Sequence, residues 1–70
     1  MPKQTKLVFW TPISTTVGEV EVSGEYYLDG DGFITVRLPG VGSRSARGGP
    51  AAESIARIVL GELYRESRHT

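Results

Sequence analysis

The strongest hydrophobic pattern in the chain is a helical repeat in its last third. At about 100° per residue, one stripe collects the small and aliphatic side chains of residues 52–63, which are Ala52, Ile55, Ala56, Val59 and Leu63, with Leu60 on its flank. Pro50 suits the first turn of a helix, and Gly48 and Gly49 interrupt regular structure before it. The pattern predicts an amphipathic helix over about residues 50–67, with this stripe facing a core.

The other side of the predicted helix is polar, with Gly61 in the middle and Ile58 at its margin. A glycine in an exposed helix costs about 1 kcal/mol relative to alanine. Gly61 is therefore either a tolerated glycine or a place where another surface approaches closely. Single exposed apolar residues are common, so we favour the first interpretation and keep Ile58 and Gly61 as candidate interface residues.

Period-two alternation predicts a strand over about residues 18–28, with apolar side chains on one face and mainly acidic ones on the other. Residues 29–32 (Asp-Gly-Asp-Gly) predict a turn, and residues 33–38 a returning strand. An odd-length loop with a glycine bulge keeps one face apolar. The expected register pairs Tyr26 with Ile34, Gly24 with Val36, and Val22 with Leu38.

The remaining segments predict one more strand and one long loop. Residues 6–10 are strongly β-prone, and Thr11-Pro12 is expected to end a strand over about residues 6–11. Ser14-Thr15-Thr16 then forms a polar connection, and residues 39–49 form a loop rich in glycine, serine and arginine. The predicted fold is α+β: a three-stranded antiparallel sheet (β-β-β) packed by one C-terminal amphipathic helix, in a single small domain over residues 1–70.

The second face of this sheet has no predicted cover. Trp10, Tyr27 and Phe33 are expected on it or beside it, and an exposed aromatic patch marks an interaction site. A domain of this size buries only about 60% of its unfolded surface, and self-association buries more. We therefore expect a homodimer or protein interface that includes Trp10, Tyr27 and Phe33.

Charges cancel over the whole chain but separate along it. Eight basic and eight acidic residues argue against a strongly basic nucleic-acid binder. Residues 19–31 hold five acids and no base, whereas residues 37–47 hold three arginines and no acid. The separated charges are either solvated surfaces or surfaces of opposite sign that contact a partner. The candidate partner-binding residues are Glu19, Glu21, Glu25, Arg37, Arg44 and Arg47.

The sequence offers little for catalysis or metal binding. It has no cysteine, and its only histidine is His69, near the end of the chain. Residues 29–32 resemble the start of a calcium loop but join two predicted strands. Residues 40–49 precede a helix N-terminus, where an anion can bind, but they lack the Gly-Lys-Ser/Thr of a Walker A loop. We expect no enzyme activity, no cofactor and no metal.

Two resemblances extend this interpretation. Residues 25–63 resemble the C-terminal half of a double-stranded-RNA-binding domain, with a hairpin, a Gly-Ser-Arg-Ser loop and an alanine-bearing helix. Where that family carries its phosphate-binding lysines, this chain has Ala46-Arg47 and Gly49-Pro50-Ala51. The small cysteine-free plan, with its Ser-Ala-Arg-Gly-Gly-Pro-Ala-Ala junction and one helix, resembles phage-encoded anti-CRISPR proteins. That resemblance implies a compact, dimeric inhibitor that acts in the cytoplasm of a bacterial host.

The predicted function is a non-enzymatic binding or inhibitor protein that occupies a partner's surface, and an anti-CRISPR-type inhibitor of an effector complex is its most concrete form. The alternative is a small nucleic-acid-binding domain that uses Arg37, Arg44, Arg47 and Arg57. No apolar run is long enough to span a membrane, and the N-terminus lacks the apolar core of a signal peptide. A membrane partner is therefore not expected.

Overall fold

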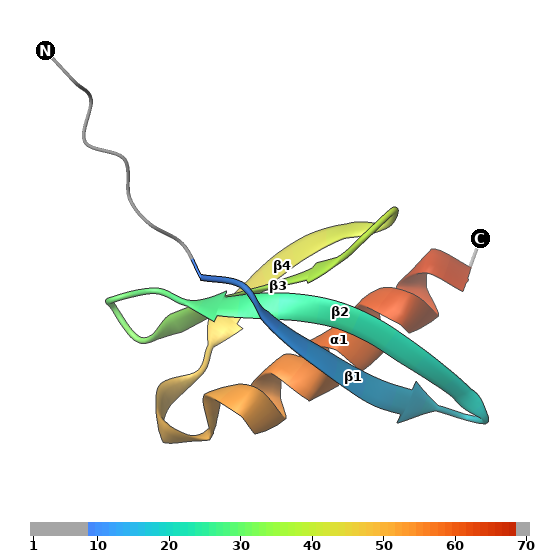
Figure 1. Ribbon diagram of the computed structural model, residues 1–70, viewed down its shortest axis with the longest axis horizontal. Helices are drawn as coiled ribbons and strands as arrows, with labels where there is room; N and C mark the ends of the chain where they lie inside the picture. The colour runs from blue at the N-terminus through green and yellow to red at the C-terminus, as the bar shows by residue number, and fades with distance from the viewer. Residues whose placement is uncertain (1–8, 69–70) are drawn as a thin grey trace, which may run out of the picture.

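The computed structural model describes residues 9–68, which form a four-stranded antiparallel sheet and one C-terminal helix. In chain order the elements are β1 (Thr11–Val17), β2 (Val20–Leu28), β3 (Phe33–Leu38), β4 (Gly42–Arg47), a 3-10 turn η1 (Gly49–Ala51) and α1 (Ala52–Arg68). The strands lie in the order β1-β2-β3-β4, and α1 contacts all four of them from one side of the sheet (Figure 1). The predicted α+β fold with one C-terminal helix is confirmed, but the prediction of three strands is wrong.

The missed strand is β4, which lies within the predicted loop over residues 39–49. Its sequence, Gly-Ser-Arg-Ser-Ala-Arg, has no β-branched or aromatic side chain, so it carries no strand signal. The turn before β4 does have a recognisable sequence. Pro39 and Gly40 occupy the central positions of a tight turn, with Gly40 at φ 83°. The amide of Val41 donates to the carbonyl of Leu38 at 2.9 Å, which directs the chain back along β3.

The first strand lies further along the chain than predicted. Residues 6–8 of the expected strand lie outside the described residues, Phe9 and Trp10 precede β1, and the expected connection Ser14-Thr15-Thr16 lies inside it. Pro12 lies in β1, an edge strand, which is where a proline is tolerated in a sheet. Arg57 of α1 donates from Nε to the carbonyl of Ser14 at 3.2 Å, so the helix also holds this edge by a hydrogen bond.

The β2–β3 hairpin has the expected odd-length loop but a different register. Leu28 pairs with Ile34 and Tyr26 with Val36, a shift of two residues from the predicted pairing of Tyr26 with Ile34. Because side chains alternate with period two, a shift of two leaves every side chain on its own face. The hydrophobic pattern therefore cannot distinguish the two registers. Gly32, at φ 88°, provides the left-handed position that the turn requires.

The core lies between α1 and the facing side of the sheet. The helix contributes Ala52, Ala56, Val59, Leu60 and Leu63, and the sheet contributes Ile13, Val22, Ile34, Val36 and Leu38. The predicted stripe is confirmed, with Ile55 half-buried. Gly61 corrects the prediction, because it is buried rather than exposed on the back of the helix. A Cβ at Gly61 would lie 3.6 Å from Cγ2 of Val17, so the surface that approaches this glycine is the chain's own β1.

Helix and sheet approach each other closely at Gly24. A Cβ there would lie 2.5 Å from Cδ1 of Leu60 and 2.6 Å from the carbonyl oxygen of Arg37. We expect Gly24→Ala to lower the free energy of unfolding by about 1–3 kcal/mol, since the added methyl overpacks the core. Urea unfolding followed by circular dichroism measures this. The control is Gly30→Ala, where a Cβ meets nothing within 4 Å; equal losses in both variants would contradict the packing argument.

Candidate functional site

The side of the sheet that faces away from α1 is the open face. It bears the side chains that alternate with the core residues along β2, β3 and β4, preceded by Trp10. These are Glu21, Ser23, Glu25 and Tyr27 on β2, Phe33, Thr35 and Arg37 on β3, and Ser43, Ser45 and Arg47 on β4. None of them is buried, so the open face is accessible to a partner.

Four candidate residues meet in one cluster on the open face. The rings of Trp10 and Tyr27 make an edge-to-face contact, with centroids 4.7 Å apart and planes at 88°. The guanidinium carbon of Arg37 lies 3.9 Å from the centroid of the Trp10 ring. Nε of Arg37 also donates to Oε2 of Glu25 at 2.8 Å, and the two side chains form an ion pair. We call these four residues the Trp10 cluster.

The contacts within the Trp10 cluster restrict its side chains before any partner binds. An aromatic edge-to-face pair contributes about 0.5–1.5 kcal/mol beyond its buried area, and an exposed cation–π contact about 0.5–1 kcal/mol. Arg37 takes part in both a cation–π contact and an ion pair. The sequence had placed Trp10 and Tyr27 in one candidate group and Glu25 and Arg37 in another, and the structure brings them together.

Phe33 lies at the far end of the open face with a separate partner. It pairs across strands with Arg47, whose guanidinium carbon lies 5.3 Å from the centroid of the Phe33 ring. Between this pair and the Trp10 cluster, the hydroxyls of Thr35 and Ser45 lie 3.2 Å apart. Phe33 is 41% exposed, so the open face has two aromatic positions separated by hydroxyl side chains. The expected register, which pairs Tyr26 with Ile34, also sets Tyr27 opposite Phe33, and this pairing is wrong because Tyr27 pairs with Thr35.

Arg44 and Arg47 were predicted in one loop, over residues 39–49, but the structure places their side chains on opposite faces of the sheet. Residues 44 and 47 are three apart in β4, so alternation directs Arg44 toward α1, where it forms ion pairs with Glu62 at 3.5 Å and with Glu66. The hydrogen bond from Arg44 lowers the pKa of Glu66, and the same bond raises the pKa of Arg44. Arg44 therefore joins β4 to α1 and does not belong to the open face.

The remaining candidates lie apart from the open face. Glu19 lies in the turn between β1 and β2, and Ile58 is 58% exposed on α1. Ile58 and the buried Gly61 both line a hollow of about 230 Å³ between α1 and the end of β1.

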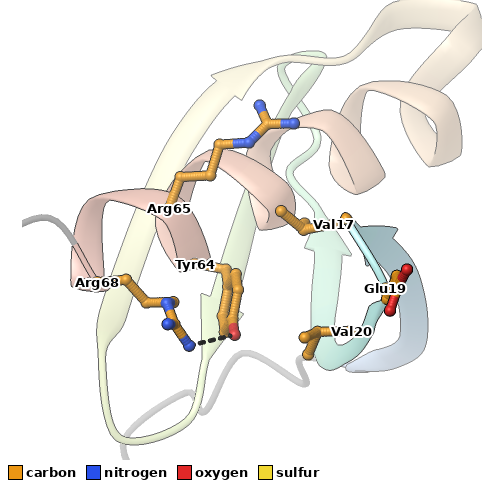
Figure 2. A pocket seen from close by; sticks show the side chains of 7 residues that line it. Val17, Glu19, Val20, Tyr64, Arg65 and Arg68 are labelled. Atoms are coloured by element: carbon orange, nitrogen blue, oxygen red, sulfur yellow. Dashed lines mark hydrogen bonds between the residues drawn. The ribbon is translucent and has the colours of Figure 1, made fainter.

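The sequence did not predict an open hollow of about 540 Å³ between the β1–β2 turn and the C-terminal part of α1. Figure 2 shows Tyr64 and Arg68 on one side of it and Val17 and Val20 on the other. Nη1 of Arg68 donates to the hydroxyl of Tyr64 at 3.0 Å, and Val20 is 44% exposed. The residues that line this hollow come from segments more than forty positions apart, so no local sequence pattern indicates it. Of the predicted candidate residues, Glu19 alone lines it.

The position of Arg44 generates a test by carboxylate titration. The Glu66 pKa should lie below its ordinary value and should rise toward that value in Arg44→Gln, because the hydrogen bond to the carboxylate is lost. Since the folded-state pKa is lowered, the pair stabilises the fold above the unfolded-state pKa, and this stabilisation is lost as pH falls through the folded-state pKa. NMR titration of the Glu66 side chain measures the change. Arg57→Gln, which removes an ion pair with Glu53 instead, is the control and should leave Glu66 unchanged; an ordinary Glu66 pKa in the unaltered chain would refute the pairing.

Within residues 9–68 no helix is long and apolar enough to cross a membrane, and no group of three or more His, Cys, Asp or Glu side chains converges as a metal site would require. Comparison with known proteins gives no match among protein-family models, curated proteins or solved structures.

Proposed function

We propose that this chain is a non-enzymatic binding protein that acts by covering the surface of a partner protein with its open face. The observation that carries the proposal is the Trp10 cluster, in which a tryptophan, a tyrosine and an arginine lie together on an accessible surface. These three residue types dominate the binding energy of protein interfaces. Their mutual contacts also reduce the conformational entropy lost on binding, which favours affinity.

The exposure of the polar side chains supports a binding function over a catalytic one. No polar or charged residue in the described part of the chain is buried. Electrostatic catalysis depends on charged and polar groups held where water is excluded. The carboxylates Glu21 and Glu25 both remain accessible to water, Glu21 at an open hollow of about 330 Å³ that Pro12 and Arg57 also line. The described surface therefore suits recognition of another macromolecule better than chemistry on a small substrate.

Ion pairing favours a protein partner over a nucleic acid. Of the four arginines considered for nucleic-acid binding, three already pair with carboxylates: Arg37 with Glu25, Arg44 with Glu62 and Glu66, and Arg57 with Glu53. Nucleic-acid affinity comes largely from cations that replace the counterions of phosphates. An arginine held by a carboxylate of its own chain must first lose that partner. Arg47, whose guanidinium lies over Phe33, is the remaining candidate for a phosphate or a base.

The resemblance to anti-CRISPR proteins identifies the first partner to test, a bacterial CRISPR effector complex. In this form of the proposal the open face covers a protein site on the effector and prevents that site from working. The Trp10 cluster supplies the central contact, and the surrounding hydroxyls supply a polar rim.

Binding to purified effector complexes tests the inhibitor form directly. With the chain immobilised, biolayer interferometry should detect at least one effector, and Trp10→Ala should weaken that binding by about thirtyfold, because truncating a central aromatic residue costs about 2 kcal/mol. The control is Ile58→Ala, which truncates an exposed side chain on the back of α1. Circular dichroism confirms that each variant is folded. Failure of every effector to bind, or equal binding of the Trp10→Ala variant, would count against this form.

A salt titration tests the nucleic-acid alternative. We expect no saturable binding of labelled single-stranded RNA, double-stranded RNA or double-stranded DNA at about 50 mM salt, measured by fluorescence anisotropy. Binding that falls by orders of magnitude between about 50 and 200 mM salt, and that Arg47→Gln weakens, would reverse the order of the two proposals.

A further inference from the structure

The charges of the open face are divided between its two halves. Both of its carboxylates, Glu21 and Glu25, project from β2, whereas both of its guanidiniums, Arg37 and Arg47, project from β3 and β4. The boundary between the halves runs along the junction of β2 and β3. A face that is acidic on one half and basic on the other is complementary to itself after a half-turn.

Side-chain size is also divided near the centre of the face. The large rings of Trp10 and Tyr27 lie on the β1–β2 half, whereas beside them β3 and β4 present the small hydroxyls of Thr35, Ser43 and Ser45, and Phe33, the ring of the other half, lies at the end of β3. Packed sheets need large side chains opposite small ones so that the two layers interdigitate. The open face therefore matches itself in shape as well as in charge.

We propose that the occupant of the open face is a second copy of this chain, related by a two-fold axis that runs parallel to the strands between β2 and β3. The inference rests on the proposed function for the position of the binding surface and assigns that surface to a second copy, which excludes an effector from the same face while the dimer persists. This rotation places β2 over the partner's β3, and the end of the chain before β1 over the partner's β4. An axis perpendicular to the strands would instead place β2 over β2 and oppose like charges.

The strand register shows which residues meet. Glu25 and Arg37 are directly paired neighbours, so the half-turn brings Glu25 opposite the partner's Arg37 and Arg37 opposite the partner's Glu25. The four side chains form an alternating ring of charges around the axis, in which no charge loses its present partner. In the next row Tyr27 pairs with Thr35, and Thr35 with Ser45. Tyr27 therefore lies over the partner's Thr35, and Trp10 lies over the partner's Ser45.

Charge reversal tests this arrangement. Glu25→Arg makes the centre of the open face wholly basic, and Arg37→Glu makes it wholly acidic. By sedimentation equilibrium, the unaltered chain should reach the dimer mass at micromolar concentration, and each variant alone should raise the dimer dissociation constant about tenfold or more, because like charges then meet. An equimolar mixture of the two variants should recover the dimer mass. Arg65→Glu, a charge reversal on the exposed back of α1, is the control and should dimerise normally.

Recovery in the mixture separates the interface from folding, because a misfolded variant is not restored by adding a second one. A monomeric mass that does not change on concentration would overturn the inference, as would a dimer that neither variant weakens or that mixing fails to restore. The proposed function has a separate outcome. If the chain is a monomer that binds an effector, and Trp10→Ala weakens this binding, the proposed function holds without the dimer. If the dimer responds to the variants as expected but no effector binds, the partner of the open face is a second copy and the inhibitor form of the proposed function is contradicted.

Discussion

The structure depends on the close packing of α1 against one side of the sheet. Leu60 fits against the backbone at Gly24, and both Leu60 and its neighbour Ala56 are fully buried. This contact aligns a single helix along a four-stranded sheet, as Figure 1 shows. A single helix can bury only one side of a sheet, and the opposite side must be polar enough to face water or must be covered by another molecule. The open face is thus a direct consequence of the core. Its charged and hydroxyl side chains allow it to face water, and its aromatic side chains allow another molecule to cover it.

The parts of the fold that were predictable are those specified by buried apolar side chains. The stripe on α1 and the alternation along β2 each follow from the periodicity of residues that contact the core. β4 was missed because its one apolar contribution to the core is the half-buried Ala46. Backbone pairing with β3 and the ion pairs of Arg44 with α1 hold it in place. The β2–β3 register was wrong by two residues because both registers bury the same side chains. Gly61 was assigned to the exposed back of α1 because the helical repeat alone does not show that β1 packs there.

The candidate site was predictable in its residue types but not in its geometry. Trp10, Tyr27 and Phe33 were identified because aromatic side chains fall where no cover was expected, but nothing in the sequence shows that Arg37 lies over Trp10. The error over Arg44 follows from the missed strand: in a loop Arg44 and Arg47 project freely, whereas in a strand they must project from opposite faces. The hollow in Figure 2 was missed because it forms where the β1–β2 turn meets the far end of α1.

The balance of charge constrains how the open face recognises its partner. Because eight acidic and eight basic residues cancel, the chain has little net charge with which to attract a partner over long distances. Specificity must then come from short-range complementarity, where each charge meets an opposite charge and each ring meets a surface of matching shape. The Glu25–Arg37 pair at the centre of the face satisfies its own charges in the free chain and offers an alternating pattern to whatever covers it. A partner with the same alternating pattern leaves both of these charges paired, and the face of a second copy has that pattern by symmetry.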